Sequence, residues 1–380
     1  MSSPSYPRRR DPAKIAGAVI IVAILAVASL LIVDWMGRET EPVVLRVYTY
    51  DSFMVWGDDP ATIDNRTFDA FEEQYGVEVR IERLTTDANG IVSRLVAEAA
   101  NPVADVVIGI DNILILQEEA KSVLTPFTPS NLNLINDTLV NLLDPQHHVV
   151  PFDFGLVTVI FDSIEINATT NPELDALTFS DLATPELASA LVTENPFFSS
   201  PGLAFLLSEI AFQEKLLGQD WEDWWSAVKD DINIQPGWSE AWEVWDLDPE
   251  RKLLVSYGTD PAYSSWWSGE APTTSVAPYH HDGNDYAWLQ IEGIGLVKNG
   301  PNPTIARAFI EYCLTSAVQE NIATNQWMFP ANMDVTLHPA FDYALHPDDV
   351  SPLNDLLSAA EIAANLTTWL DEWENIITSW

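Results

Sequence analysis

The stretch VVLRVYTYDSF (43–53) begins an alternation of strand and helix patterns that sets the fold class of this 380-residue chain. Its first eight residues are rich in β-branched and aromatic side chains, which is typical of a strand, and Asp51 lies just beyond the strand's carboxyl end. Phe68 and Phe71 then recur at helical spacing, and Gly76 is a typical helix stop. We therefore expect a strand followed by a helix.

The same pattern repeats further along the chain. In VEVRIERL (77–84) apolar and charged residues alternate, as in a half-exposed strand, and residues 90–100 predict a second helix. ADVVIGI (104–110) is a continuous apolar run, typical of a central parallel strand, and Asp111 follows it. In such sheets ligands bind beyond the carboxyl ends of the strands, where loops and helix N-termini converge. Asp51 and Asp111 are therefore expected at a binding edge.

The second half of the chain predicts a second set of elements. Strands are expected at 149–161, 191–193, 253–257 and 288–297, and helices at 201–217, 220–229 and 303–321, with one or two further helices at 353–380. A polar stretch, 125–148, separates the two sets. The fold class is therefore α/β, with two lobes, each a mixed sheet flanked by helices, and a ligand cleft between the lobes.

Composition excludes one class of partner. The chain has 57 acidic and 17 basic residues, for a formal net charge of −40, which repels the phosphate backbone of nucleic acids. The 47% hydrophobic content is enough for substantial cores. Such an acidic surface favours cationic ligands, but it also serves solubility, and charge alone does not separate the two explanations. The single cysteine, Cys313, lies in an apolar helical pattern and is expected to be buried.

The N-terminal 42 residues predict a membrane segment. Basic residues at 8–10 and Lys14 precede an uncharged apolar run, 15–33, which is long enough to cross a bilayer. Residues 34–42 form a short charged spacer. We expect an uncleaved anchor or a signal segment, with the remainder of the chain on the outer face of the cytoplasmic membrane, or secreted or periplasmic.

Six short segments pair aromatic side chains with an acid, a hydroxyl residue or a glycine. They are YTYDSF (48–53), GIDN (109–112), PFDFG (151–155), GWSEAW (237–242), SYGTDPAY (256–263) and NQWMFP (325–330). Aromatic faces attract a delocalised cation through the ring quadrupole, and a nearby carboxylate adds attraction. Together the segments predict a cleft for a flat, positively charged small molecule.

Other interpretations of the same residues stay open. The histidine pairs 147–148 and 280–281 suggest a metal, but adjacent histidines point in different directions and no further ligands are spaced to join them, so we expect no metal site. Scattered acids could form a glycosidase pair on an exported protein; the candidates are Asp51, Asp111, Asp153 and Glu240. No nucleophile elbow or phosphate loop is visible, and we expect no enzyme and no catalytic residues.

A resemblance to a known family narrows the range of possible functions. VYTYDSF, ADVVIGIDN, VPFDFG, SPGLAFLL, GWSEAW, VSYGTDPAY and NQWMFPANMDVTL resemble segments of the thiamine-binding proteins of ABC importers, which are extracellular solute-binding proteins. The resemblance covers about residues 43–380. It implies a periplasmic-binding-protein-like fold of type II, which captures thiamine or its phosphates by closing two lobes and delivers it to ABC permease subunits. Another small cation or a metal–anion complex is the alternative ligand.

The resemblance also implies site residues and domain limits. The aromatic clamp falls on Trp238, Tyr257, Tyr263 and Trp327, with Asp111 and Asp51 as compensating acids and Ser200 and Gly202 as donors at a helix N-terminus. Lobe 1 is expected to comprise 43–150 with 264–320, and lobe 2 to comprise 151–263 with 321–380, after the segment 1–42. A monomer is expected, with thiamine as transported ligand and no cofactor.

The sequence departs from the family pattern at three positions. Phe154 and Phe329 stand where the pattern has Tyr, and Gly258 stands where it has Thr. These departures bear on the hydrogen bonds that would separate thiamine from its monophosphate and diphosphate. Since few basic residues lie near the motifs, free thiamine is the expected ligand.

Overall fold

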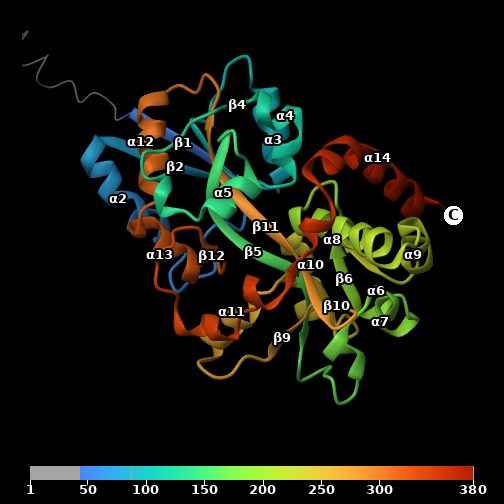
Figure 1. The fold of residues 1–380 in the computed structure, drawn as a ribbon. Coiled ribbons are helices and arrows are strands. Elements are labelled where there is room, and N and C mark those ends of the chain that lie inside the picture. The colour runs from blue at the N-terminus through green and yellow to red at the C-terminus, as the bar shows by residue number, and fades with distance from the viewer. Residues whose placement is uncertain (1–42, 87, 380) are drawn as a thin grey trace, which may run out of the picture. The chain divides into compact units, whose positions relative to one another are not determined.

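The computed structural model describes residues 43–86 and 88–379. The expected anchor, 15–33, lies outside these residues. Within the described ranges, every helix is too short or too polar to cross a membrane. Residues Val44–Trp380 form one compact unit, a mixed α/β arrangement whose sheet is flanked by helices (Figure 1). The predicted α/β class is confirmed.

The sheet has parallel edges and an antiparallel centre. Its main strands follow the order β2 (Val77–Leu84), β1 (Val43–Tyr50), β3 (Val106–Asp111), β11 (Asn284–Val297), β5 (Val149–Asp162), β8 (Leu253–Tyr257), β6 (Leu191–Glu194) and β7 (Asn233–Gln235). Strands β1 and β3 pair in parallel, as do β8, β6 and β7, whereas β11 runs antiparallel to both β3 and β5. Short strands extend the centre: β4 (Leu124–Thr125), β9 (Thr274–Ala277), β10 (Tyr279–His281), β12 (Phe329–Pro330) and β13 (Ser351–Pro352).

The two longest strands, β5 and β11, connect the two halves of the sheet. Residues 149–157 of β5 pair with β11, and residues 157–161 pair with β8. The register between β5 and β11 shifts at Glu292/Gly293, which marks a bulge in the middle of this pairing. Polar side chains of both halves are therefore brought to the same central region.

Helices cover the sheet on its faces and at its ends (Figure 1). The longer ones are α2 (Ile63–Tyr75), α3 (Ala88–Ala97), α8 (Ser200–Ile210), α9 (Trp221–Val228), α10 (Trp238–Leu247), α11 (Asp260–Ser268), α12 (Pro303–Cys313), α13 (Ser316–Asn325) and α14 (Ala359–Thr378). Helices α12 and α13 both pack on α2, and α14 packs on α9. Gly76 ends α2 in the left-handed conformation (φ 64°), as its position in the sequence predicts.

Two predicted helices differ from the observed ones. The expected helix 303–321 is two helices, because Thr315 adopts an extended conformation between α12 and α13. The expected helix 201–217 is α8 followed by a π-helical segment, η4 (Ala211–Leu217), that ends at Gly218. The C-terminal segment begins with a short 3-10 turn, η7 (Leu353–Leu356), before α14. Helix α10 has no counterpart among the predicted elements.

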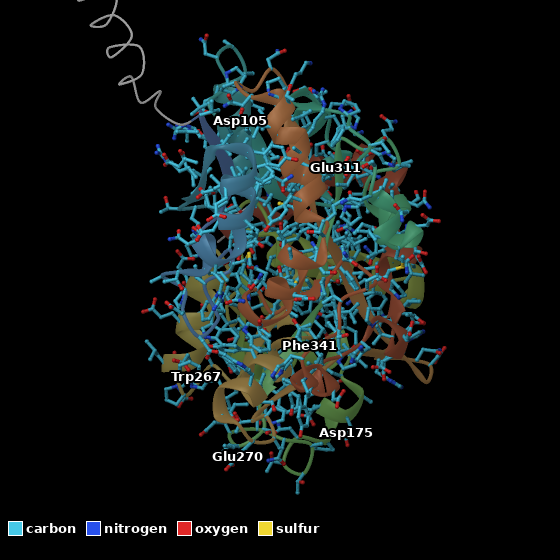
Figure 2. The ribbon with its side chains drawn as sticks, turned by 90° about the vertical axis from the view of Figure 1, so that its left-hand side faces the viewer. Asp105, Asp175, Trp267, Glu270, Glu311 and Phe341 are labelled. Carbon is cyan, nitrogen blue, oxygen red and sulfur yellow. The ribbon has the colours of Figure 1, made fainter. Side chains whose placement is uncertain are left out.

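Several tryptophans are buried in the hydrophobic core. Trp221, Trp224 and Trp225 of α9 are buried. Cys313 is fully buried, as its apolar helical pattern predicts. Trp267, by contrast, is 74% exposed at the end of α11. Figure 2 shows Trp267 and Glu270 toward one end of the described unit, and Asp105 and Glu311 toward the other.

Candidate functional site

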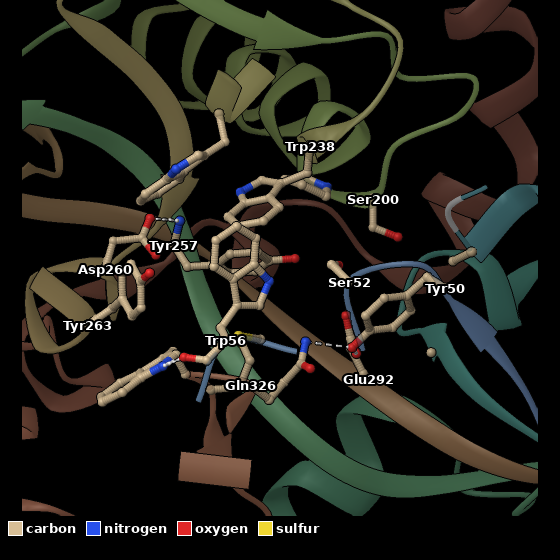
Figure 3. Close-up of a pocket in the computed structure, with 16 residues that line it drawn as sticks. Tyr50, Ser52, Trp56, Ser200, Trp238, Tyr257, Asp260, Tyr263, Glu292 and Gln326 are labelled. Carbon is tan, nitrogen blue, oxygen red and sulfur yellow. Dashed lines mark hydrogen bonds between the residues drawn. The ribbon is translucent and has the colours of Figure 1, made fainter. Parts of the chain in front are cut away.

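A pocket lies where α10, α11 and the residues after α13 meet the central strands (Figure 3). It holds about 720 Å³ of space that protein atoms do not fill, including its open mouth. Seven of its lining residues are aromatic: Tyr50, Trp56, Trp238, Trp242, Tyr257, Tyr263 and Trp327. The others are Ser52, Ala88, Gly109, Ser200, Pro201, Asp260, Glu292, Gln326 and Met328.

The four aromatic residues predicted as a clamp all line this one pocket. Trp56 connects them, since its ring centroid lies 5.4 Å from that of Trp238 and 5.8 Å from that of Tyr263, in both cases edge to face. Tyr263 in turn lies 5.6 Å from Trp327. Aromatic rings from distant parts of the chain therefore surround one space, as a site for a flat ligand requires.

Helix α10 places two of the indoles. Trp238 and Trp242 are four residues apart and therefore lie on the same face, with ring centroids 5.3 Å apart. The indole Nε1–H of Trp238 donates to Ser256 Oγ at 2.9 Å, which fixes the ring against β8. The polar edge of Trp238 is thus satisfied by protein, while the ring lies at the pocket lining against Trp242 and Trp56.

Trp327 has an unusual backbone. It follows α13 with φ +57°, a left-handed conformation that is costly for residues other than glycine. Its indole Nε1–H donates to the backbone oxygen of Trp56 at 3.0 Å. The ring also stacks on Phe341 at 6.0 Å, so protein contacts fix its position at the pocket.

Asp260 supplies one pocket carboxyl. It lies in the first turn of α11 and is buried, and its side chain accepts hydrogen bonds from Ser256 Oγ and from the backbone N–H of Tyr257. Burial raises the pKa of Asp260 to about 7, against the opposing effect of these two hydrogen bonds. A carboxyl with this pKa changes charge near neutral pH.

Glu292 supplies the second carboxyl, on the opposite wall. Its Oε2 accepts a 2.6 Å hydrogen bond from the hydroxyl of Tyr50, which in turn accepts one from Gln326 Nε2 at 2.8 Å. Burial, followed by the charges of Glu292 and Asp153, raises the pKa of Tyr50 well above its usual value. Tyr50 therefore stays a hydrogen-bond donor to Glu292 (Figure 3).

Asp111 acts behind the pocket. It is fully buried, and its Oδ1 accepts the N–H groups of Ile113 and Leu114 at 2.8 Å each. Its Oδ2 accepts a hydrogen bond from Ser200 Oγ, and Ser200 itself lines the pocket. Asp111 thus orients a lining hydroxyl and is not itself among the lining residues.

Two other predicted site residues lie outside the lining. Gly202 is buried against the backbone of Glu194, and its N–H points to Ser199 Oγ at 3.4 Å, so the helix cap already uses this donor. Asp51 is exposed. Burial of part of its side chain raises its pKa above the usual value.

The three departures from the family pattern also lie beyond the lining. Phe154 and Phe329 stack on each other, with centroids 5.4 Å apart, across the pairing of β5 and β12. Gly258 faces Leu345, and a Cβ there would lie 2.9 Å from the Cβ of Leu345. At Phe154, Phe329 and Gly258 apolar packing therefore stands in place of the hydroxyl groups of the family pattern. None of the three residues is among those that line the pocket.

Several lining residues were missed by the sequence reasoning. The missed residues Tyr50, Trp242, Asp260 and Gln326 all belong to the six quoted segments. The segments were therefore identified correctly. The acids chosen from them, Asp51 and Asp111, do not line the pocket, whereas Asp260 does. Trp242 could have been found from its spacing to Trp238. Trp56 and Glu292 lie outside every quoted segment, and only the folded arrangement identifies them.

The alternative sites lack the required geometry. In the part of the chain that the structure describes, no three His, Cys, Asp or Glu side chains gather to hold a metal. His148 and His280 instead bond to Asp144 and Asp285, at 3.0 and 2.7 Å. None of the four acids considered for a glycosidase pair is among the residues that line the pocket.

Comparisons with known proteins identify the family. The model of the family "Bacterial extracellular solute-binding protein" matches residues 66–347. The thiamine-binding periplasmic protein of Escherichia coli (strain K12) is 30% identical over 339 residues, which are 88% of this chain and 94% of that protein. The protein of the same name from Brucella melitensis is 29% identical and covers 87% of this chain and 90% of its own length.

Solved structures give the same result for the fold. A periplasmic thiamin binding protein superposes with a TM-score of 0.73 at 27% identity, covering 90% of this chain and 98% of its own. A ferric binding protein from Campylobacter jejuni superposes with a TM-score of 0.66 at 19% identity, over 87% of this chain and 99% of its own, which shows the fold alone. The chain therefore belongs to the family of bacterial extracellular solute-binding proteins, which are binding proteins and not enzymes, and within it resembles the thiamine-binding periplasmic proteins.

Proposed function

We propose that this protein captures thiamine and delivers it to an ABC importer. The observation that carries the proposal is the lining of the pocket: seven aromatic residues and two carboxyls, with no Lys or Arg among the described residues that line it. A thiazolium ring has a fixed positive charge, and each cation–π contact contributes about 0.5–2 kcal/mol depending on desolvation. The similar proteins described above are named for binding thiamine, which favours the same ligand.

The proposed contacts follow from the lining. Trp238, Tyr257, Tyr263 and Trp327 enclose the rings of thiamine, and the carboxyls of Asp260 and Glu292 supply the compensating charge on opposite walls. Ser200, held by Asp111, offers a polar contact at the start of α8. In this proposal Asp51 contributes only at longer range, because its side chain is exposed.

We propose free thiamine as the preferred form. A phosphate would need positive groups or unused N–H donors. The pocket offers carboxyls instead, and the N–H of Gly202 is directed to the cap residue Ser199. A phosphate ester should therefore bind more weakly than thiamine.

Capture is proposed to close two lobes, 43–150 with 264–320 and 151–263 with 321–380. The continuity of β5 and β11 across both halves of the sheet supports this division, since these strands are suited to act as the connection. Packing of α14 on α9 supports the placement of the C-terminal helix in the second lobe. The segment 1–42 would hold the protein at the membrane beside the permease.

Calorimetric titration of the purified protein with thiamine tests the proposal, with tryptophan emission as a second signal. Thiochrome, a neutral oxidised analogue of thiamine, tests the role of charge, and choline tests whether any small cation suffices. We expect thiamine to bind at least about tenfold more tightly than either, a difference of about 1.4 kcal/mol. Absence of thiamine binding would refute the proposal, and consumption of the ligand would indicate an enzyme.

A further inference from the structure

Three acidic residues lie side by side on adjacent strands at the base of the pocket. In the sheet register, Glu292 of β11 is the partner of Asp111 on β3 and of Asp153 on β5. Directly opposed residues of antiparallel strands have Cβ atoms about 4.5–5.5 Å apart. The carboxylate of Asp111 already accepts hydrogen bonds from the backbone N–H groups of Ile113 and Leu114 and from the Ser200 hydroxyl. Asp153 and Glu292 therefore remain as a facing pair.

Asp153 is the buried member of the pair. It is fully buried, and neither of its carboxyl oxygens has a hydrogen-bond partner among the residues that the structure describes. Burial raises its pKa well above the usual value, and the negative charge of Glu292 raises it further. An ionised Asp153 would therefore be unsolvated and would face a second negative charge.

Glu292 is the pocket member. Its carboxylate accepts hydrogen bonds from Tyr50 at 2.6 Å and from Gln290 at 3.1 Å, both of which favour its charged form. Because these donors serve Glu292, a proton shared by the pair is more stable on Asp153. Glu292, which lines the pocket, is then the member of the pair that a ligand can contact.

Among the described residues, the groups that face the pair come from several neighbouring strands. Strand β1 contributes Tyr50, β3 contributes Asp111 and β8 contributes Tyr257, whose hydroxyl accepts from Gln290 at 2.8 Å. Strand β12 contributes Pro330, the register partner of Asp153. None of these groups is positive, so a cation bound in the pocket is the charge that can stabilise a doubly ionised pair.

We propose that Asp153 and Glu292 together hold one proton while the pocket is empty and release it to solvent when a cation binds beside Glu292. Asp153 is then a specificity-determining residue that acts through Glu292. A cationic ligand exchanges its charge for the proton, whereas a neutral ligand of the same shape leaves the proton in place. This inference rests on the proposed thiamine site and specifies how that site selects charge.

The sign of the pH dependence follows from linkage. Binding that releases a proton becomes tighter as pH rises, with at most a tenfold change in Kd per pH unit for one full proton. Asp260, whose pKa is about 7, lies in the same pocket and can add its own proton release. The experiment must therefore separate the two sources.

Calorimetry at pH 7 in phosphate and in Tris, applied to variants, separates release by Asp260 from release by the Asp153–Glu292 pair. These buffers differ in ionisation enthalpy. The difference in observed heat between them therefore gives the number of protons released per thiamine bound. The protein is compared with Asp153→Asn, Asp260→Asn and the double variant. We expect release to persist in Asp260→Asn, to decrease in Asp153→Asn and to vanish in the double variant. Thiochrome should release no proton from any of them.

Two results would overturn the inference: release that Asp153→Asn leaves unchanged, or thiamine binding to Asp260→Asn without release. If Asp153→Asn does not fold, the Kd of Asp260→Asn between pH 6 and 8 decides, since a flat profile contradicts the pair and a Kd that falls with rising pH supports it. Failure of the unsubstituted protein to bind thiamine at all would instead refute the proposed function.

Discussion

Trp327 donates its indole N–H to the backbone oxygen of Trp56 at 3.0 Å, joining residues 271 positions apart in the sequence. Both residues line the pocket. The bond fixes the edge of the Trp327 ring, while the left-handed backbone (φ +57°) fixes its direction. Two constraints therefore hold one aromatic wall, which reduces the ordering that a ligand must impose when it binds.

Replacement of Trp327 with Ala should weaken thiamine binding at least about tenfold, because the substitution removes a ring face and the hydrogen bond to Trp56. Trp327→Phe should retain more affinity, since a ring face remains. Calorimetric Kd values measure both. Trp267→Ala is the matched control, because Trp267 is 74% exposed and outside the lining. An unchanged Kd in Trp327→Ala would remove this residue from the site.

A glycine variant separates the two roles of Trp327. Trp327→Gly should be more stable than Trp327→Ala by about 1 kcal/mol, because glycine adopts a left-handed backbone without the Cβ penalty. Both variants should bind thiamine equally weakly, since both lack the ring. Denaturant unfolding measures the difference, and a more stable alanine variant would show that the backbone at residue 327 relaxes.

Asp260→Asn should weaken thiamine binding more at pH 8 than at pH 6. Burial raises the pKa of Asp260 to about 7, so the carboxyl is mostly neutral at pH 6 and mostly charged at pH 8, where it attracts the cation. Kd values at the two pH values give the comparison. Asp342→Asn, an exposed acid on the 3-10 turn η5 (Pro339–Tyr343) that packs on α11, should have little effect at either. Equal losses at both pH values would contradict a titrating Asp260.

The sequence could predict the pocket's aromatic members better than its acids. The family resemblance implies a clamp of Trp238, Tyr257, Tyr263 and Trp327, and these four residues line one pocket. Which carboxyl in a motif faces the ligand depends on helix phase and strand register. Asp51 and Asp111 follow strands, yet one is exposed and the other caps a turn.

Prediction of the fold from the sequence has the same limit. Strands β1, β2 and β8 have the predicted bounds, because alternation and β-branching are local signals. The antiparallel placement of β11 between β3 and β5 depends on pairing over long separations, which local patterns do not encode. That placement is what brings Glu292 into the pocket, so the residue could not be identified from its surroundings in the sequence.

Gly109→Ala should weaken thiamine binding as well as stability. Gly109 has φ +105°, and a Cβ there would lie 2.6 Å from the ring of Tyr50, so the ring must move away from Glu292. Gly76→Ala is the matched control, since Gly76 also has positive φ (+64°) but its Cβ would meet nothing within 4 Å. We expect both variants to lose stability and only Gly109→Ala to lose affinity. Equal affinities would mean that Tyr50 adjusts without disturbing the site.

Glu209→Gln should stabilise the protein at pH 8 and change it little at pH 5. Glu209 of α8 is fully buried, and within the described residues neither carboxyl oxygen has a hydrogen-bond partner. Burial raises its pKa well above the usual value, although nearby Gln213 and Trp225 oppose the shift. The unfolded chain therefore loses this proton at lower pH than the folded protein does. Stability consequently falls as pH rises from the unfolded-state pKa towards the folded-state value.

The glutamine variant cannot ionise, so it lacks this loss of stability. Its melting temperature should exceed that of the unsubstituted protein at pH 8, and the two should converge at pH 5, where Glu209 is protonated in the folded state. Glu243→Gln, at an exposed position of α10, controls for the general effect of one charge fewer on a chain with a net charge of −40. A gain of the same size in both variants would assign the effect to overall charge repulsion. A gain confined to Glu209→Gln would assign it to the buried carboxyl.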